Sequence, residues 1–124
     1  MKKWMVVLYA GAMAACPAAW ANFTCSGPIT YLGVSSASTL YVTVASFGVW
    51  PICNLAGPYS SGGTTVNVDS CKAWYAALLT QKVTGGTATL YFTSAAGTAN
   101  GPECTAMGTW VTLNPLPYHI DYWQ

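Results

Sequence analysis

A single helical segment, set among segments that alternate like β-strands, is the feature that most constrains the fold. Between residues 71 and 82 apolar side chains recur every three or four residues, which is the period of a helix packed on one face. The members of this stripe are Cys71, Trp74, Tyr75, Leu78, Leu79 and Lys82. Asp69 or Ser70 is expected to cap the helix start, and Gly85 and Gly86 are expected to end it.

Three segments before this helix and two after it are predicted to be strands, and residues 39–46 and 87–94 show the period-two alternation most clearly. They are residues 28–34, 39–46, 49–55, 87–94 and 108–113. Residues 56–67 are rich in Gly, Ser and Pro and are expected to form a loop. The order strand, strand, strand, helix, strand, strand is that of an OB-fold, a small five-stranded barrel. We therefore expect a mainly β, OB-fold-like barrel with one helix.

The first 21 residues have the three parts of a secretory signal peptide. Two lysines form a positive start, residues 4–15 form an apolar run, and Ala19 and Ala21 fit cleavage before Asn22. A run of this length is too short to cross about 30 Å of hydrocarbon, which disfavours a membrane anchor. The expected product is one exported domain, residues 22–124, in the periplasm or outside a Gram-negative bacterium.

A second processing route stays open. Residues 13–16 read Met-Ala-Ala-Cys and resemble a bacterial lipobox, in which Cys16 would become a lipidated N-terminus. Met stands where Leu is usual, and Pro17 follows the cysteine directly. Cleavage before Asn22 is therefore preferred, and lipid anchoring through Cys16 is the alternative.

Four cysteines remain for pairing on either processing route, because Cys16 is either removed with the leader or lipidated. Their wide spacing, with no C-x-x-C pair and one histidine in the whole chain, disfavours a zinc site, and no other metal or cofactor is predicted. An even number of cysteines in a small exported chain instead predicts two disulfides, for which three connectivities exist. The OB-fold order favours Cys53–Cys71, because Cys53 ends the third strand and Cys71 opens the helix. Cys25–Cys104 is then the second bridge.

Charged side chains are scarce throughout the chain. Beyond the first 21 residues Lys72 and Lys82 stand against three carboxylates, and the chain has no arginine. Such a chain cannot form the basic surface that nucleic-acid binding requires, nor a polybasic membrane patch. Because 53% of the residues are apolar and 14% are aromatic, intrinsic disorder is excluded as well.

Three segments of the chain form a recognisable pattern. They are the strand end Trp50-Pro51-Ile52-Cys53, the aromatic helix of residues 72–79, and the exit at residues 85–86 into residues 88–92. This pattern, about a third of the chain, resembles the cell-binding B subunits of the subtilase-cytotoxin, typhoid-toxin and pertussis-toxin group. The resemblance implies a secreted, disulfide-bonded OB-fold that assembles into a ring and binds surface glycans. It carries no binding residue over, and the chain also resembles small exported proteobacterial proteins of unknown function.

Catalytic signals in the sequence are weak. His119 and Asp121 lie two residues apart, so they share one face of a strand and suit a base and its orienting carboxylate. No G-x-S-x-G motif accompanies them. The scattered carboxylates Asp69 and Glu103 make a poor glycosidase pair. We predict that the protein is not an enzyme and has no catalytic residues.

Aromatic side chains are the remaining functional signal. Trp74 and Tyr75, on the helical stripe, are predicted to be core residues. Aromatic rings with amides nearby suit sugars, whose C–H faces are apolar and whose hydroxyls need fixed partners. The candidates at loop and strand-end positions are Trp50, Asn54, Tyr59, Trp110, Asn114 and Tyr118. The alternative is that these rings only fill the ends of the barrel.

Two functions follow from these patterns. The first is an exported, non-catalytic binding module for a surface glycan, and the alternative is a structural or interaction protein of the envelope with an envelope protein as partner. Open strand edges with little charge to protect them favour self-association. Pro51, Pro115 and Pro117 can blunt one edge. A monomer is slightly preferred over a homo-oligomer such as a pentamer.

Overall fold

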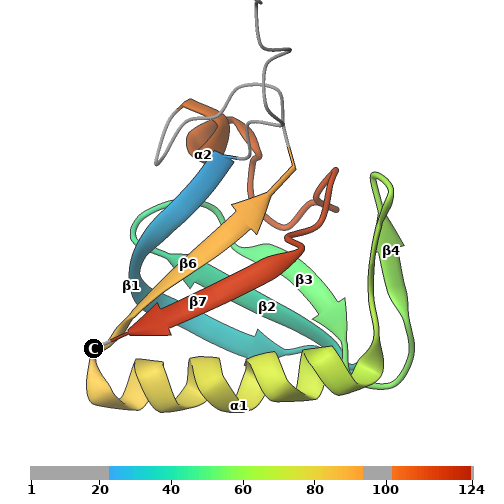
Figure 1. The fold of residues 1–124 in the computed structure, drawn as a ribbon, viewed down its shortest axis with the longest axis horizontal. Coiled ribbons are helices and arrows are strands. Elements are labelled where there is room, and N and C mark those ends of the chain that lie inside the picture. Colours follow the sequence, from blue (N-terminus) through green and yellow to red (C-terminus); the bar gives the residue numbers. More distant parts are fainter. Residues whose placement is uncertain (1–22, 94–101, 124) are drawn as a thin grey trace, which may run out of the picture.

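The computed structural model describes residues 23–93 and 102–123. Five strands form one antiparallel sheet in the order β3-β2-β1-β6-β7, and β4 and β5 form a separate hairpin (Figure 1). The elements are β1 (Phe23–Val34), β2 (Thr39–Val44), β3 (Trp50–Asn54), β4 (Tyr59–Ser61), β5 (Thr64–Val66), α1 (Val68–Thr84), β6 (Thr87–Phe92), α2 (Pro102–Ala106) and β7 (His119–Trp123). The predicted fold class, mainly β with one main helix after the third strand of the sheet, is confirmed.

The long strand β1 joins the two halves of the sheet. Its first half pairs with β6 and its second half pairs with β2. The register shifts between Ile29 and Tyr31, and such a bulge bends a strand and increases its twist. The sheet curves like part of a small barrel but does not close, because β3 and β7 are its two edges. The closed barrel expected from the element order is therefore wrong.

The segment 108–118 runs from the edge of β3 to β7. The Trp110 N–H donates to the Val49 oxygen at 2.8 Å, and the Leu116 N–H donates to the Ser61 oxygen at 3.4 Å. Leu113 and Leu116 are buried, so this segment contributes to the core without being part of the sheet.

The strand expected at 108–113 is also wrong, and the last strand is β7. Gly108 and Trp110 have φ values of 78° and 58°, which an extended strand does not allow. Residues 56–67, expected to be a loop, contain the β4–β5 hairpin. Gly62 and Gly63 both have positive φ at its tip, as a tight two-residue hairpin turn requires.

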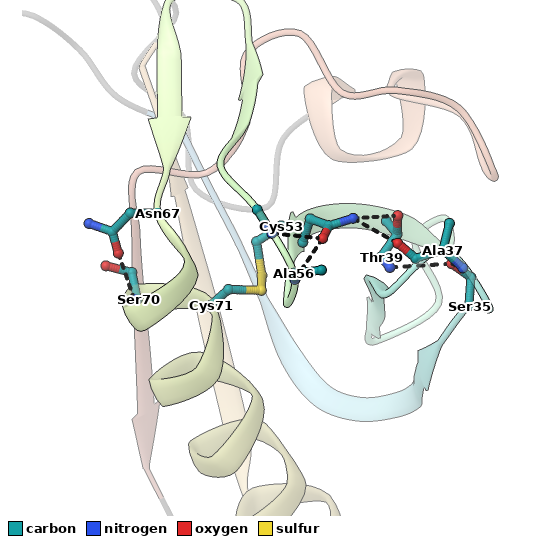
Figure 2. The surroundings of a disulfide bond; sticks show 10 residues. Ser35, Ala37, Thr39, Cys53, Ala56, Asn67, Ser70 and Cys71 are labelled. Atoms are coloured by element: carbon teal, nitrogen blue, oxygen red, sulfur yellow. Dashed lines mark hydrogen bonds between the residues drawn. A yellow bond between two sulfur atoms is a disulfide. The ribbon is translucent and has the colours of Figure 1, made fainter.

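Helix α1 begins earlier than expected. Asn67 is the N-cap, not Asp69 or Ser70, and its side-chain oxygen accepts from the Ser70 N–H at 2.8 Å (Figure 2). Gly85 ends the helix in the left-handed conformation, φ 74°, as predicted.

The helical stripe is only partly the buried face of α1. Cys71 and Leu78 are buried, and Trp74 and Tyr75 are partly buried against the core. Leu79 is exposed, whereas Gln81 takes a buried position.

Both predicted disulfides are confirmed. Cys53 and Cys71 join the end of β3 to the first turn of α1, with 5.6 Å between their Cα atoms (Figure 2). Cys25 and Cys104 join β1 to α2. Two disulfides indicate an oxidising compartment outside the cytoplasm. Within residues 23–93 and 102–123, neither helix has the length and apolar character of a membrane span.

Candidate functional site

The structure places Trp50 in the core. Its side chain has no exposed surface and packs edge-on against Phe92, with ring centroids 6.0 Å apart. The indole N–H donates to the Gly108 oxygen at 3.0 Å. A fully buried ring cannot stack on a sugar, so Trp50 is a core residue and leaves the candidate set.

Asn54 and Tyr59 have structural roles as well. The Asn54 amide nitrogen donates to the Ala37 oxygen at 3.0 Å, and its side-chain oxygen accepts from the Ala56 N–H at 2.8 Å. These bonds hold the turn between β1 and β2 to the loop that follows β3. Tyr59 lies on β4 and is partly buried against the core. Neither side chain is placed as a free ligand contact.

The other three predicted residues are exposed, but the structure does not bring them together. All three lie on the segment 108–118. Trp110 packs against tyrosines of β1 and β2, whereas Tyr118 packs against Tyr91 of β6. Asn114 lines a shallow groove beside α2. The predicted residues therefore do not form one site.

Trp110 forms the centre of an exposed aromatic cluster with Tyr31 and Tyr41, here called the Trp110 cluster. The centroid distances from the indole are 5.8 Å to Tyr31 and 5.2 Å to Tyr41, at interplanar angles of 75° and 51°. Trp110 is 60% exposed and Tyr31 is 40% exposed. The two tyrosines thus support the indole and leave more than half of it open to solvent.

Two features place the tyrosines on the outer face of the sheet: alternation in β2 for Tyr41, and for Tyr31 the register shift after Ile29, which sets it opposite Thr43. Leu40 and Val42 of β2 point into the core, so Tyr41 lies on the opposite face. Tyr41 pairs with Gly33 of β1. A Cβ at residue 33 would lie 2.7 Å from the Tyr31 hydroxyl, so this glycine gives Tyr31 its room beside Tyr41.

Trp110 is held in an unusual backbone conformation. Its φ of 58° is left-handed, which is strained for a bulky residue and costs on the order of 1–3 kcal/mol. The Trp110 N–H donates to the Val49 oxygen at 2.8 Å, and the Val49 N–H donates to Thr109 Oγ1 at 2.9 Å. Backbone strain held in place by its surroundings is a feature that concentrates at functional sites.

A second exposed cluster lies on β6 and β7 and contains Tyr91, Tyr118, His119 and Asp121, here called the His119 cluster. His119 Nε2 and Asp121 Oδ1 are 2.7 Å apart, so the two side chains share one strand face as predicted. The Tyr91 hydroxyl donates to Asp121 Oδ2 at 2.8 Å. The Tyr91 and His119 bonds lower the pKa of Asp121, and the bond to Asp121 raises the pKa of Tyr91.

The described residues of the His119 cluster are arranged differently from a nucleophilic triad. A triad needs a serine, cysteine or threonine on the free side of the imidazole. Here the hydroxyl beside the carboxylate belongs to Tyr91, which donates to Asp121. Ser26 is paired in register with Thr89, and their hydroxyl oxygens are 2.5 Å apart. The cluster is best explained as a polar network between two strands.

Comparison with protein-family models, curated proteins and solved structures finds no match for the chain. The resemblance to toxin binding subunits therefore stays a prediction. The Trp110 cluster combines an exposed indole, two supporting tyrosines and a strained backbone, and it is the candidate site. The sequence predicted Trp110 as a site residue but not Tyr31 or Tyr41; the place of Tyr41 opposite Leu40 and Val42 in a predicted strand was an available signal, whereas Tyr31 faces outward only through the register shift after Ile29.

Proposed function

We propose that the protein is an exported, non-catalytic binding module that recognises a surface glycan through the Trp110 cluster. The observation that carries the proposal is the indole of Trp110, which is 60% exposed and packs against two tyrosines, on a residue with a left-handed backbone. An exposed aromatic face suits the apolar C–H face of a sugar ring, and tyrosine hydroxyls suit its polar groups.

Rigidity of the cluster supports this function further. Tyr31 and Tyr41 lie on paired strands, and Trp110 is anchored to Val49 at the start of β3. A ring fixed before binding loses little conformational freedom when the ligand arrives, which favours affinity.

The route of export belongs to the same proposal. The disulfides require an oxidising compartment. We expect cleavage before Asn22 and a periplasmic or secreted product, with lipid attachment at Cys16 as the alternative. Both positions lie outside the described residues. The mass of the N-terminal peptide of the protein purified from its host distinguishes the two routes.

A glycan array tests the binding function. The full chain is expressed with its own leader, and the exported product is compared with Trp110→Ala and Tyr122→Ala. Tyr122 is the matched control, because it is 49% exposed but lies on β7, outside the cluster. We expect Trp110→Ala to weaken binding at least tenfold and Tyr122→Ala to preserve it. Absence of binding to any glycan, or full binding by Trp110→Ala, contradicts the proposal.

The second candidate function, an interaction protein of the envelope, has one observation in its favour. Leu79 and Val83 of α1 are 44% and 79% exposed and lie four residues apart, on one side of the helix. In-cell crosslinking to an envelope protein that is lost in Val83→Lys and retained in Trp110→Ala supports this function against the first.

A further inference from the structure

Resting on the proposed function, we infer that the ligand of the Trp110 cluster is an uncharged glycan built of hexopyranose rings, and not a sialylated or sulfated one. Two separate observations carry this inference. One is the absence of charge from the elements that form the cluster. The other is the position of every basic side chain that the described residues contain.

The elements that build the cluster carry no charge at all. Residues 22–68, which include β1 to β5, contain no Asp, Glu, Lys, Arg or His. Residues 104–118, which include Trp110, contain none either. A carboxylate or sulfate at the cluster would therefore be removed from water without a cationic partner from these elements, which disfavours binding.

The basic side chains of the described residues lie elsewhere. The two lysines, Lys72 and Lys82, are exposed on α1. His119 lies 2.7 Å from the Asp121 carboxylate on β7. The chain has no arginine, which is the residue best shaped to bind carboxylate or sulfate in two-point contacts.

The helix N-termini, the other common anion sites, are also unfavourable. The free N–H groups of a helix start bind anions through their partial positive charge. The α1 start is capped by the Asn67 side chain and carries Asp69 in its first turn. The first turn of α2 carries Glu103. Each helix start thus already holds an acceptor of its own or a negative charge.

A neutral sugar ring fits the remaining chemistry. The indole offers an apolar face, and Tyr31 and Tyr41 offer neutral hydroxyls around it. Such a surface gains from apolar contact and neutral hydrogen bonds, which salt screens little. Binding is therefore expected to be nearly independent of ionic strength.

Matched pairs of glycans test this inference. Each pair contains a neutral oligosaccharide ending in galactose or glucose and the same oligosaccharide capped with sialic acid or sulfate. Binding to the exported protein is measured by calorimetry at about 0.05 M and about 0.5 M NaCl, a range over which exposed charge pairs become screened. We expect the neutral member to bind, the cap to give no gain, and the affinity to change less than twofold with salt. The double variant K72A/K82A should bind like the parent protein.

The outcomes separate the two proposals. Binding that requires Trp110 but is confined to the capped members, and that weakens with salt, overturns the neutral-glycan inference and leaves the binding function standing. The same holds if K72A/K82A loses affinity tenfold. Failure of both members to bind overturns the neutral-glycan inference, whereas equal binding by Trp110→Ala overturns the proposed function itself.

Discussion

The backbone N–H of Trp110 donates to the carbonyl oxygen of Val49 at 2.8 Å, which ties the exposed tryptophan of the cluster to the residue directly before β3. The next residue, Trp50, is fully buried and donates through its indole N–H to the Gly108 oxygen at 3.0 Å. Two tryptophans thus fasten the same two segments, one from inside the core and one from the surface. The candidate site is therefore positioned by core packing.

Trp110→Gly should remove glycan binding and should destabilise the protein less than Trp110→Ala does. Glycine adopts a φ of 58° freely, whereas Trp110→Ala keeps the left-handed strain. We expect Trp110→Gly to be about 1 kcal/mol more stable than Trp110→Ala, while both lose glycan binding. Urea unfolding of the two variants measures this difference. An alanine variant that is the more stable of the two contradicts the strained conformation of Trp110.

Gly48→Ala should disrupt the junction beneath Trp110. A Cβ at residue 48 would lie 1.8 Å from the Gly108 oxygen, the acceptor of the Trp50 indole. We expect a loss of about 3 kcal/mol in the free energy of unfolding. Gly57→Ala is the control, because a Cβ there meets nothing within 4 Å, and it should cost less than about 0.5 kcal/mol. Equal stabilities of the two variants in urea would show that segment 108–110 does not pack closely on Gly48.

Local patterns predicted the parts of this fold that local chemistry decides. The stripe around Leu78 and the glycines after the helix predicted α1 and its end, because helical period and a left-handed cap are properties of neighbouring residues. The order of strands then placed Cys53 beside Cys71, which predicted both bridges.

Tertiary contacts decided the rest. Segment 108–113 is rich in residues that favour strands, but its hydrogen bonds to Val49 and the positive φ of Trp110 keep it out of the sheet. Asn67, Asp69 and Ser70 are all residue types that cap helices well. Asn67 is the cap because β5 ends at Val66, directly before it. Tyr31 and Tyr41 come together only through the register of β1 and β2, which alternation within one strand does not contain.

Asn67→Ala should destabilise α1. The side-chain oxygen of Asn67 is the acceptor for the Ser70 N–H, and alanine leaves that donor without it. We expect a loss of about 1 kcal/mol in the free energy of unfolding, and only a few tenths for Asn67→Gly. Thermal unfolding of the two variants measures the ranking. If Ser70→Ala costs more than Asn67→Ala, the assignment of the cap is wrong.

Removal of the disulfides should destabilise the protein, and more for the longer loop, because the entropy of loop closure grows with the logarithm of loop length. Cys53–Cys71 spans 18 residues and Cys25–Cys104 spans 79. By loop-closure entropy, C53A/C71A should cost about 3 kcal/mol and C25A/C104A about 4.5 kcal/mol. Chemical unfolding of the two double variants under non-reducing conditions gives both values. The opposite ranking would mean that contacts around the short bridge outweigh the entropy of the unfolded chain.

Tyr91→Phe should reduce the pH dependence of stability. The hydrogen bond from the Tyr91 hydroxyl is the main cause that lowers the pKa of Asp121, and His119 adds to it. A carboxyl whose pKa is lower in the folded state stabilises the fold above its unfolded pKa, and this contribution is lost as the pH falls through the folded pKa. The variant should therefore lose less stability than the parent between about pH 6 and about pH 2.

At alkaline pH the stability changes in the opposite direction, because Tyr91 is the group that titrates there. The bond to Asp121, followed by burial and the negative charge of Asp121, raises the pKa of Tyr91. This contribution is present at neutral pH and is lost as the pH rises through the raised pKa, so Tyr91→Phe should also flatten the alkaline limb. NMR titration of the Asp121 carboxyl carbon gives the direct test, with Tyr122→Phe as the control on the same strand. The pKa of Asp121 should rise in Tyr91→Phe and stay constant in Tyr122→Phe; an unchanged value in both would rule out the Tyr91 hydroxyl as the donor that stabilises this carboxylate.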